Sequence, residues 1–127
     1  MKPTILNIKN LTEAETELAK IDVNPVGVKI MALKAVYRLV KFEDVDPKTA
    51  NIVKQEMLSR GGEVALAGTV GKFEDKKTDI IIMGTLAQYV RLIRKLRLQS
   101  YGDCLGIAKG LEDLLFKGFD VGIAPVW

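Results

Sequence analysis

Residues Thr78–Lys95, with the sequence TDIIIMGTLAQYVRLIRK, constrain the fold more than any other stretch of the chain. Ile80–Met83 is a continuous apolar run, which is typical of a central strand that is covered on both faces. A Gly-Thr turn follows and leads directly into an amphipathic, basic helix, Leu86–Leu98. Because amides at the start of a helix point beyond the strand end, this segment predicts a platform for an anion or another small ligand.

Helix and strand signals alternate along the rest of the chain. Asp46-Pro47 predicts a helix start, and Gly61-Gly62 predicts the end of the same helix. Val28–Phe42 is ambiguous, because its first half favours helix and its second half is β-branched and aromatic. A short helix followed by a strand at about Ala35–Glu43 and one continuous helix both stay open. The other β-like runs are Thr4–Ile8, Glu63–Ala67, Ile80–Met83 and Phe119–Val126.

Strands that alternate with helices indicate an α/β fold built from crossover units. The 127 residues are enough for one hydrophobic core, and no linker or low-complexity tract divides them. We therefore predict a single α/β domain, residues 1–127, with a mainly parallel sheet of about four strands and helices on both faces.

Composition removes most kinds of catalytic chemistry. The chain has no histidine and one cysteine, so triads that use histidine, histidine metal sites and thiolate zinc sites are excluded. We expect no metal, no cofactor and, on balance, no enzymatic activity. No apolar run approaches the roughly 18–20 residues that a membrane span needs, and MKPTILNIKN does not fit a signal peptide. The expected location is cytoplasmic, without a membrane.

The basic charge of the chain is concentrated in one predicted helix. The formal net charge is +3, and residues 86–99 hold four basic side chains and no acid. This row is a candidate contact for an anion or an acidic partner, although the outer faces of helices are often basic without such a role, so a solvated face is the stronger alternative. Nucleic acid is a weaker expectation, because exposed aromatics that could stack on bases are not interleaved with the charges. The row consists of Arg91, Arg94, Lys95 and Arg97.

Polar residues near the strand end form the candidate ligand site. Open α/β sheets bind ligands beyond the carboxyl ends of their strands, which here means the Gly-Thr turn. The alternative is a tight, capped turn beside a solvated helix face, with no ligand. The candidate residues are Lys34, Gln55, Glu56, Gly61, Gly62, Glu63, Gly84 and Thr85.

Three segments together resemble the N-terminal accessory region that precedes the barrel in a subset of bacterial dihydropteroate synthases. They are Lys29–Val45, Ala50–Ala67 and Thr78–Gly102. The most specific parts are KQEMLSxGGE and TDxxxMGTLxQY, and the resemblance covers about Asn24 to Leu115.

The resemblance implies a link to folate biosynthesis and no reaction of its own. The family's synthase joins a pterin diphosphate to p-aminobenzoate in a TIM-type barrel, for which this chain is far too short. The chain also lacks the family's NVTPDSF-like signature, so no catalytic residue is carried over. The expected function is a non-catalytic accessory domain with a surface for a small molecule, a synthase barrel or a second copy. An independent ligand-binding protein or enzyme that uses the strand-end cleft is the alternative.

Overall fold

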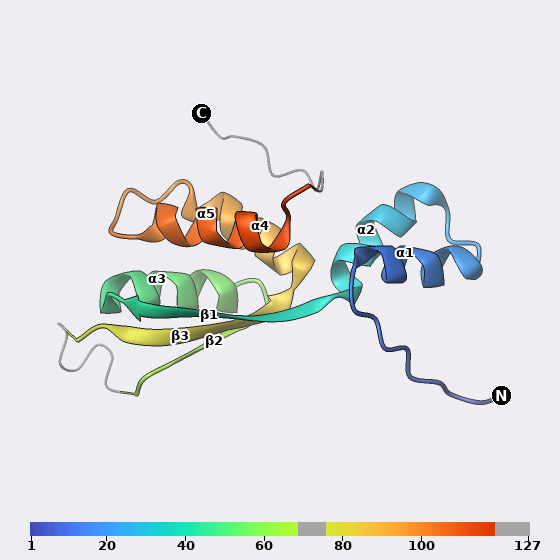
Figure 1. Ribbon diagram of the computed structural model, residues 1–127, viewed down its shortest axis with the longest axis horizontal. Coiled ribbons are helices and arrows are strands. Elements are labelled where there is room, and N and C mark those ends of the chain that lie inside the picture. Colours follow the sequence, from blue (N-terminus) through green and yellow to red (C-terminus); the bar gives the residue numbers. More distant parts are fainter. Residues whose placement is uncertain (69–75, 119–127) are drawn as a thin grey trace.

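The computed structural model describes residues 1–68 and 76–118, which form an α/β protein (Figure 1). The elements in chain order are α1 (Leu11–Lys20), α2 (Pro25–Ala35), β1 (Tyr37–Val45), α3 (Pro47–Leu58), β2 (Glu63–Leu66), β3 (Thr78–Thr85), α4 (Leu86–Leu96) and α5 (Cys104–Leu115). In these two ranges, no helix is long and apolar enough to cross a membrane.

The sheet has three strands in the order β1-β3-β2, and β3 runs antiparallel to both neighbours. The prediction of a mainly parallel, four-stranded sheet is wrong. β2 and β3 follow each other without a helix between them, and such strands pair as an antiparallel hairpin. A parallel crossover occurs only between β1 and β2. These two strands are connected by α3 and run in the same direction on either side of β3. Thr4–Ile8 is not part of the described sheet, and Phe119–Val126 lies outside the described residues.

Helices cover one face of the sheet. Figure 1 shows α3, α4 and α5 on the same side, while α1 and α2 pack together beside one end of the sheet. Ile80 and Ile82 point toward the helices and are fully buried, whereas Ile81 and Met83 on the opposite face are half-buried. The prediction of helices on both faces is therefore wrong. We call the helix-covered side of the sheet the inner face and the other side the outer face.

The ambiguous segment becomes a helix followed by a strand. Asn24 caps α2 by accepting a 2.8 Å hydrogen bond from the amide of Gly27, and Pro25 occupies the first turn. The helix ends at Ala35, and β1 begins two residues later at Tyr37. The helix-then-strand interpretation is confirmed, with the strand displaced by two residues from the range expected from sequence.

The core lies between the inner face and the helices that cover it. Its largest fully buried side chains come from α3, β2, β3, α4 and α5. Tyr89 of α4 reaches the sheet, where its hydroxyl lies 2.9 Å from the carbonyl oxygens of Arg38 and Ile82. This hydroxyl therefore anchors α4 to two neighbouring strands. The fully buried side chains of the core include Val53, Met57, Val64, Ile80, Ile82, Tyr89, Leu92, Ile93, Leu96 and Leu111.

Candidate functional site

The Gly-Thr turn between β3 and α4 is closed by its own helix cap. The hydroxyl of Thr85 accepts a 3.2 Å hydrogen bond from the amide of Gln88. In return, the side-chain oxygen of Gln88 accepts a 2.8 Å bond from the amide of Thr85. The next amide, that of Leu86, donates to the carbonyl of Val36 at 2.9 Å. Three amides of the predicted anion platform thus already have protein partners.

The sequence signal for this cap is the spacing Thr85-Leu-Ala-Gln88, which matches the S/T-x-x-E/Q capping box. Sequence reasoning identified Thr85 as a cap and missed Gln88. The side-chain nitrogen of Gln88, Nε2, also donates to the carbonyl of Arg60 at 2.9 Å, which links α4 to the end of α3. The side chain of Gln88 therefore connects the Gly84-Thr85 turn to the turn that ends α3.

The glycines of the predicted site are brought together by close packing. A Cβ atom on Gly62 would lie 2.8 Å from the carbonyl oxygen of Met83 and 2.8 Å from Met57 Cγ. A Cβ on Gly84 would lie 2.8 Å from the side-chain oxygen of Gln88. Gly61 has φ +88°, the left-handed geometry that ends a helix. Backbone and side chains of the core fill this junction.

The two carboxylates of the predicted site pair with basic residues that were not part of the prediction. Glu63 accepts a 2.8 Å bond from the amide of Val64 and pairs with Lys54 at 3.4 Å. The hydrogen bond from the amide of Val64 and the contact with Lys54 hold the pKa of the Glu63 carboxyl below its usual range. Glu56 pairs with Arg60 at 3.7 Å. Gln55 is exposed on α3, and Lys34 lies in the last turn of α2, on the helical pair beside the sheet.

The side chain of Arg60 has one buried nitrogen that these contacts do not satisfy. Its Nε atom is buried and has no hydrogen-bond partner in the part of the chain that the structure describes. Buried donors are nearly always paired, so this atom marks a local demand for an acceptor. Arg60 was not predicted as a site residue, but it directly precedes the predicted residues Gly61 and Gly62.

The basic row of α4 divides into two parts. Arg91, Arg94 and Lys95 have exposed side chains. Arg97 is only 11% exposed in its side chain and forms an ion pair with Glu112 of α5, which joins the two helices. The row therefore contributes to packing at one end, and its remaining part stays a predicted contact for an anion, a partner or, less readily, nucleic acid.

A polar cluster that the sequence did not reveal joins the start of α3 to the start of α5. Asp46 caps α3 by accepting from the amide of Thr49 at 2.9 Å, and the Thr49 hydroxyl donates to the same carboxylate at 2.5 Å. The Thr49 hydroxyl in turn accepts from the amide of Asp103 at 3.3 Å. Asp46 was predictable as a cap from Asp-Pro, whereas no local signal brings Asp103 to Thr49, which is 54 positions away.

This cluster also sets the character of the single cysteine. Cys104, the first residue of α5, is buried. Burial, together with the carboxylates of Asp46 and Asp103, raises the pKa of its thiol. A thiol held protonated in this way is a packing group and a poor nucleophile. Among residues 1–68 and 76–118, no cluster of three carboxylate or thiol side chains is placed to hold a metal ion.

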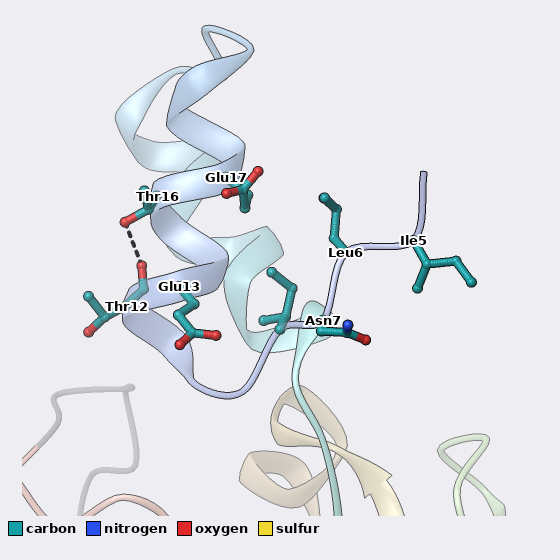
Figure 2. Close-up of a pocket in the computed structure, with 8 residues that line it drawn as sticks. Ile5, Leu6, Asn7, Thr12, Glu13, Thr16 and Glu17 are labelled. Carbon is teal, nitrogen blue, oxygen red and sulfur yellow. Dashed lines mark hydrogen bonds between the residues drawn. The ribbon is translucent and has the colours of Figure 1, made fainter. Parts of the chain in front are cut away.

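Two hollows lie beside α1, and none of the predicted site residues lines either of them. The first, of about 280 Å³, opens between the N-terminal segment and α1 (Figure 2). Figure 2 shows Leu6 of that segment nearer to α1 than Ile5 is, and the Thr16 hydroxyl donates to the carbonyl of Thr12 at 2.8 Å. The second, of about 380 Å³, lies between α1 and the start of α2.

Comparison with known proteins places the chain beside a folate enzyme. It is 36% identical over 96 residues to a probable bifunctional folylpolyglutamate synthase/dihydropteroate synthase from Halobacterium salinarum. The match spans 76% of this chain and only 12% of that relative. No protein-family model matches the chain, and no solved structure matches it. The predicted link to dihydropteroate synthase is supported by this similarity, which does not assign the chain to a particular domain of the enzyme.

Proposed function

We propose that this chain is a non-catalytic accessory domain that works with a dihydropteroate synthase-related enzyme of folate or pterin metabolism. The observation that carries the proposal is the 96-residue match to the Halobacterium protein. That protein is about eight times as long as the matched stretch, and its name gives it two activities. A short module that recurs within a much longer enzyme fits an accessory role.

The contacts at the strand end favour this role over catalysis. The side chains of Thr85, Gln88 and Glu63 accept hydrogen bonds from backbone amides of the same chain. Cys104 is buried with a raised pKa. An accessory domain needs a rigid scaffold and a surface, and these contacts supply the scaffold.

The test is association with the dihydropteroate synthase of the same organism. We expect the purified chain to bind the synthase in isothermal titration calorimetry and to change its kcat/KM or its thermal stability. The double substitution Arg91→Glu/Lys95→Glu tests the basic row as the contact, and Lys20→Glu on α1 is the control, since its side chain is also exposed. Absence of binding together with unchanged synthase kinetics would refute the proposal.

Binding of a small anionic ligand at the strand end is a second candidate function. The Nε of Arg60, beside Gly61-Gly62, favours it, because this atom is buried and has no hydrogen-bond partner among the described residues. A thermal-shift panel of pterins, folates, nucleotides and phosphate provides the test. A ligand at a hundredfold excess over its Kd stabilises by about 2.7 kcal/mol, and Arg60→Ala should remove that shift. If no compound shifts the melting temperature, this candidate is eliminated.

A further inference from the structure

The outer face of the sheet presents apolar side chains that no element of the described chain covers. The register defines two central rows across the three strands, in the order β1, β3, β2. One row is Leu39, Met83 and Glu63, and the other is Lys41, Ile81 and Ala65. Leu39 is 62% exposed, and Tyr37, which precedes it on the same face, is 54% exposed. A sheet face of this kind normally packs against another layer.

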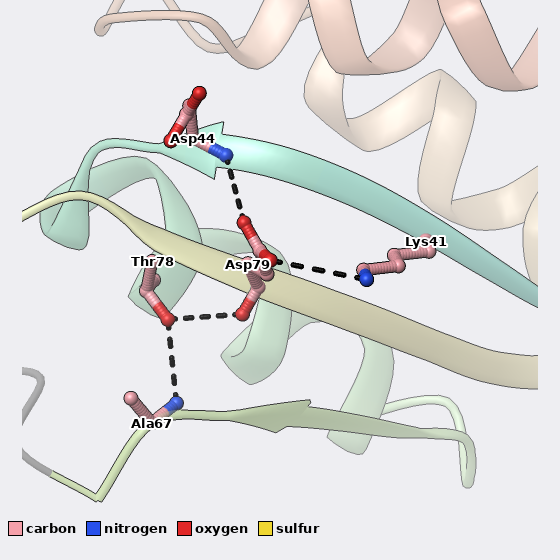
Figure 3. A network of polar contacts seen from close by, with 5 residues as sticks. All are labelled: Lys41, Asp44, Ala67, Thr78 and Asp79. Atoms are coloured by element: carbon pink, nitrogen blue, oxygen red, sulfur yellow. Dashed lines mark hydrogen bonds and ion pairs between the residues drawn. The ribbon is translucent and has the colours of Figure 1, made fainter.

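Opposite charges lie at opposite edges of this face. Lys41 stands on the β1 edge, and Glu63 stands on the β2 edge one row away. The two side chains flank the apolar strip formed by Ile81 and Met83. Figure 3 shows the far end of the face, where Asp79 accepts from the amide of Asp44 at 3.1 Å and pairs with Lys41 at 3.9 Å. These contacts hold the ends of β1 and β3 together. Lys41, and Glu63, which pairs with Lys54 at 3.4 Å, each keep more than half of their side chain exposed.

We propose that a second copy of this chain covers the outer face, related by a two-fold axis parallel to β3. Such an axis places the β1 edge of one copy over the β2 edge of the other. The axis keeps each row in place, so Leu39 of each copy lies over Glu63 of its partner and Lys41 lies over Ala65. Lys41 is thus a diagonal neighbour, one row along, of the partner's Glu63, and this contact occurs twice, while the apolar strips meet at the centre. The face is thus complementary to itself, as an isologous interface requires. Sheets packed in this way lie about 10 Å apart.

Pairing of two copies along the β1 edge is the less favourable geometry. The strand is irregular between Phe42 and Val45, and Asp44 there has φ +55°. A bulge and charged side chains are devices by which edge strands avoid pairing. The faces of the sheets, rather than their edges, therefore meet.

The size of the face sets the expected affinity. Strands of nine, eight and four residues, at about 3.4 Å per residue and about 4.8 Å between strands, give a face of roughly 350 Å². Stable interfaces bury about 800 Å² per partner, so the dimer belongs to the weak, micromolar class.

Sedimentation velocity over a series from low micromolar to several hundred micromolar protein tests the proposal. We expect a concentration-dependent monomer–dimer equilibrium. Leu39→Glu should abolish it, because the axis places this position over the partner's Glu63, where the new carboxylate would be desolvated beside a like charge. Lys41→Glu and Glu63→Lys should each weaken the dimer about tenfold through like charges, and the double variant should restore it.

The matched control is Lys109→Glu on α5, which makes the same charge change at a side chain that is 78% exposed. It should leave the dimer unchanged. Circular dichroism melting of every variant separates loss of the dimer from loss of the fold.

A wild-type chain that stays monomeric throughout the series overturns the proposal, whatever other molecule then occupies the face. A dimer that survives Leu39→Glu overturns it as well, because another surface must then be used. A dimer that Leu39→Glu dissociates but that the double charge swap fails to restore refutes the two-fold arrangement. The inference does not depend on the proposed function: the chain can dimerise with or without a synthase partner.

Discussion

On the inner face of β3, Ile80 and Ile82 are fully buried beneath the helical layer, whereas Ile81 and Met83 on the outer face are only half-buried among the residues that the structure describes. The four residues are consecutive and chemically alike. Their environments differ because α3, α4 and α5 all pack on one side, while α1 and α2 pair beside the end of the sheet (Figure 1). The placement of helices, rather than the apolar character of the strand, decides which face is core.

Truncation of one isoleucine on each face is the largest test of this difference. Ile82→Ala leaves a cavity in the core and should lower the free energy of unfolding by about 3 kcal/mol. Ile81→Ala should cost less than about 1 kcal/mol in dilute solution, because its side chain already contacts solvent. Urea denaturation followed by circular dichroism measures both values. Equal losses at low protein concentration would mean that both faces are covered within one copy.

The same pair sharpens the comparison when protein concentration is raised. A second copy on the outer face stabilises the folded chain by mass action, so the cost of Ile81→Ala should grow with concentration. The cost of Ile82→Ala should change far less. A cost of Ile81→Ala that is independent of concentration would count against dimerisation through this face.

Close packing at Gly62, where the turn after α3 meets β3, predicts the next largest effect. Gly62→Ala should destabilise the protein by about 1–3 kcal/mol, because its Cβ would lie 2.8 Å from the backbone oxygen of Met83, which cannot move without disturbing the pairing of β2 with β3.

Gly106→Ala on α5 is the control for this substitution. Nothing lies within 4 Å of the Cβ that it adds, and a helical Gly-to-Ala change stabilises by about 0.5–1 kcal/mol. Opposite signs in thermal or urea unfolding would confirm that contact, rather than the loss of glycine itself, decides. Two losses of equal size would contradict the packing of the junction.

Local signals predicted the boundaries of the helices well. Asp46-Pro47 and Gly61-Gly62 bracket α3, and Thr85 caps α4 as its sequence indicates. Each of these signals acts within about four residues, so the chain need not be folded for them to be interpreted.

The direction of the strands and the cover of the sheet could not be predicted in the same way. The apolar run Ile80–Met83 is typical of a strand buried on both faces, yet the same pattern occurs where the second face is left to another molecule. The contact of Gln88 with Arg60 joins residues 28 positions apart, and that of Asp103 with Thr49 joins residues 54 apart. Such contacts depend on the assembled core, so the predicted strand-end cleft could not be distinguished from a filled junction.

Two tyrosines extend the comparison from packing to hydrogen bonding. Tyr89→Phe removes the buried hydroxyl beside the carbonyls of Arg38 and Ile82, and we expect a loss of about 1 kcal/mol. Burial raises the pKa of Tyr89, so its phenol remains a donor throughout the neutral range. Tyr37→Phe on the outer face should change the stability of the monomer by less than about 0.5 kcal/mol, since its ring is 54% exposed. Chemical denaturation compares the two, and equal losses would mean that Tyr89 does not anchor α4.

The smallest predicted effect concerns pH and the cap that holds the helical layer. Although partial burial opposes ionisation, the hydrogen bonds from the side chain and amide of Thr49 hold the pKa of the Asp46 carboxyl below its ordinary value of 3.8. A carboxyl with a depressed pKa stabilises the folded state above its unfolded pKa, and this contribution is lost as the pH falls through the folded value. Asp46→Asn keeps a capping oxygen but cannot ionise, so wild type should exceed it by less than about 1 kcal/mol at neutral pH. As the pH falls below 3.8 the two should converge in urea unfolding, and a gap that does not change with pH would show that the charge of Asp46 contributes nothing to the cap.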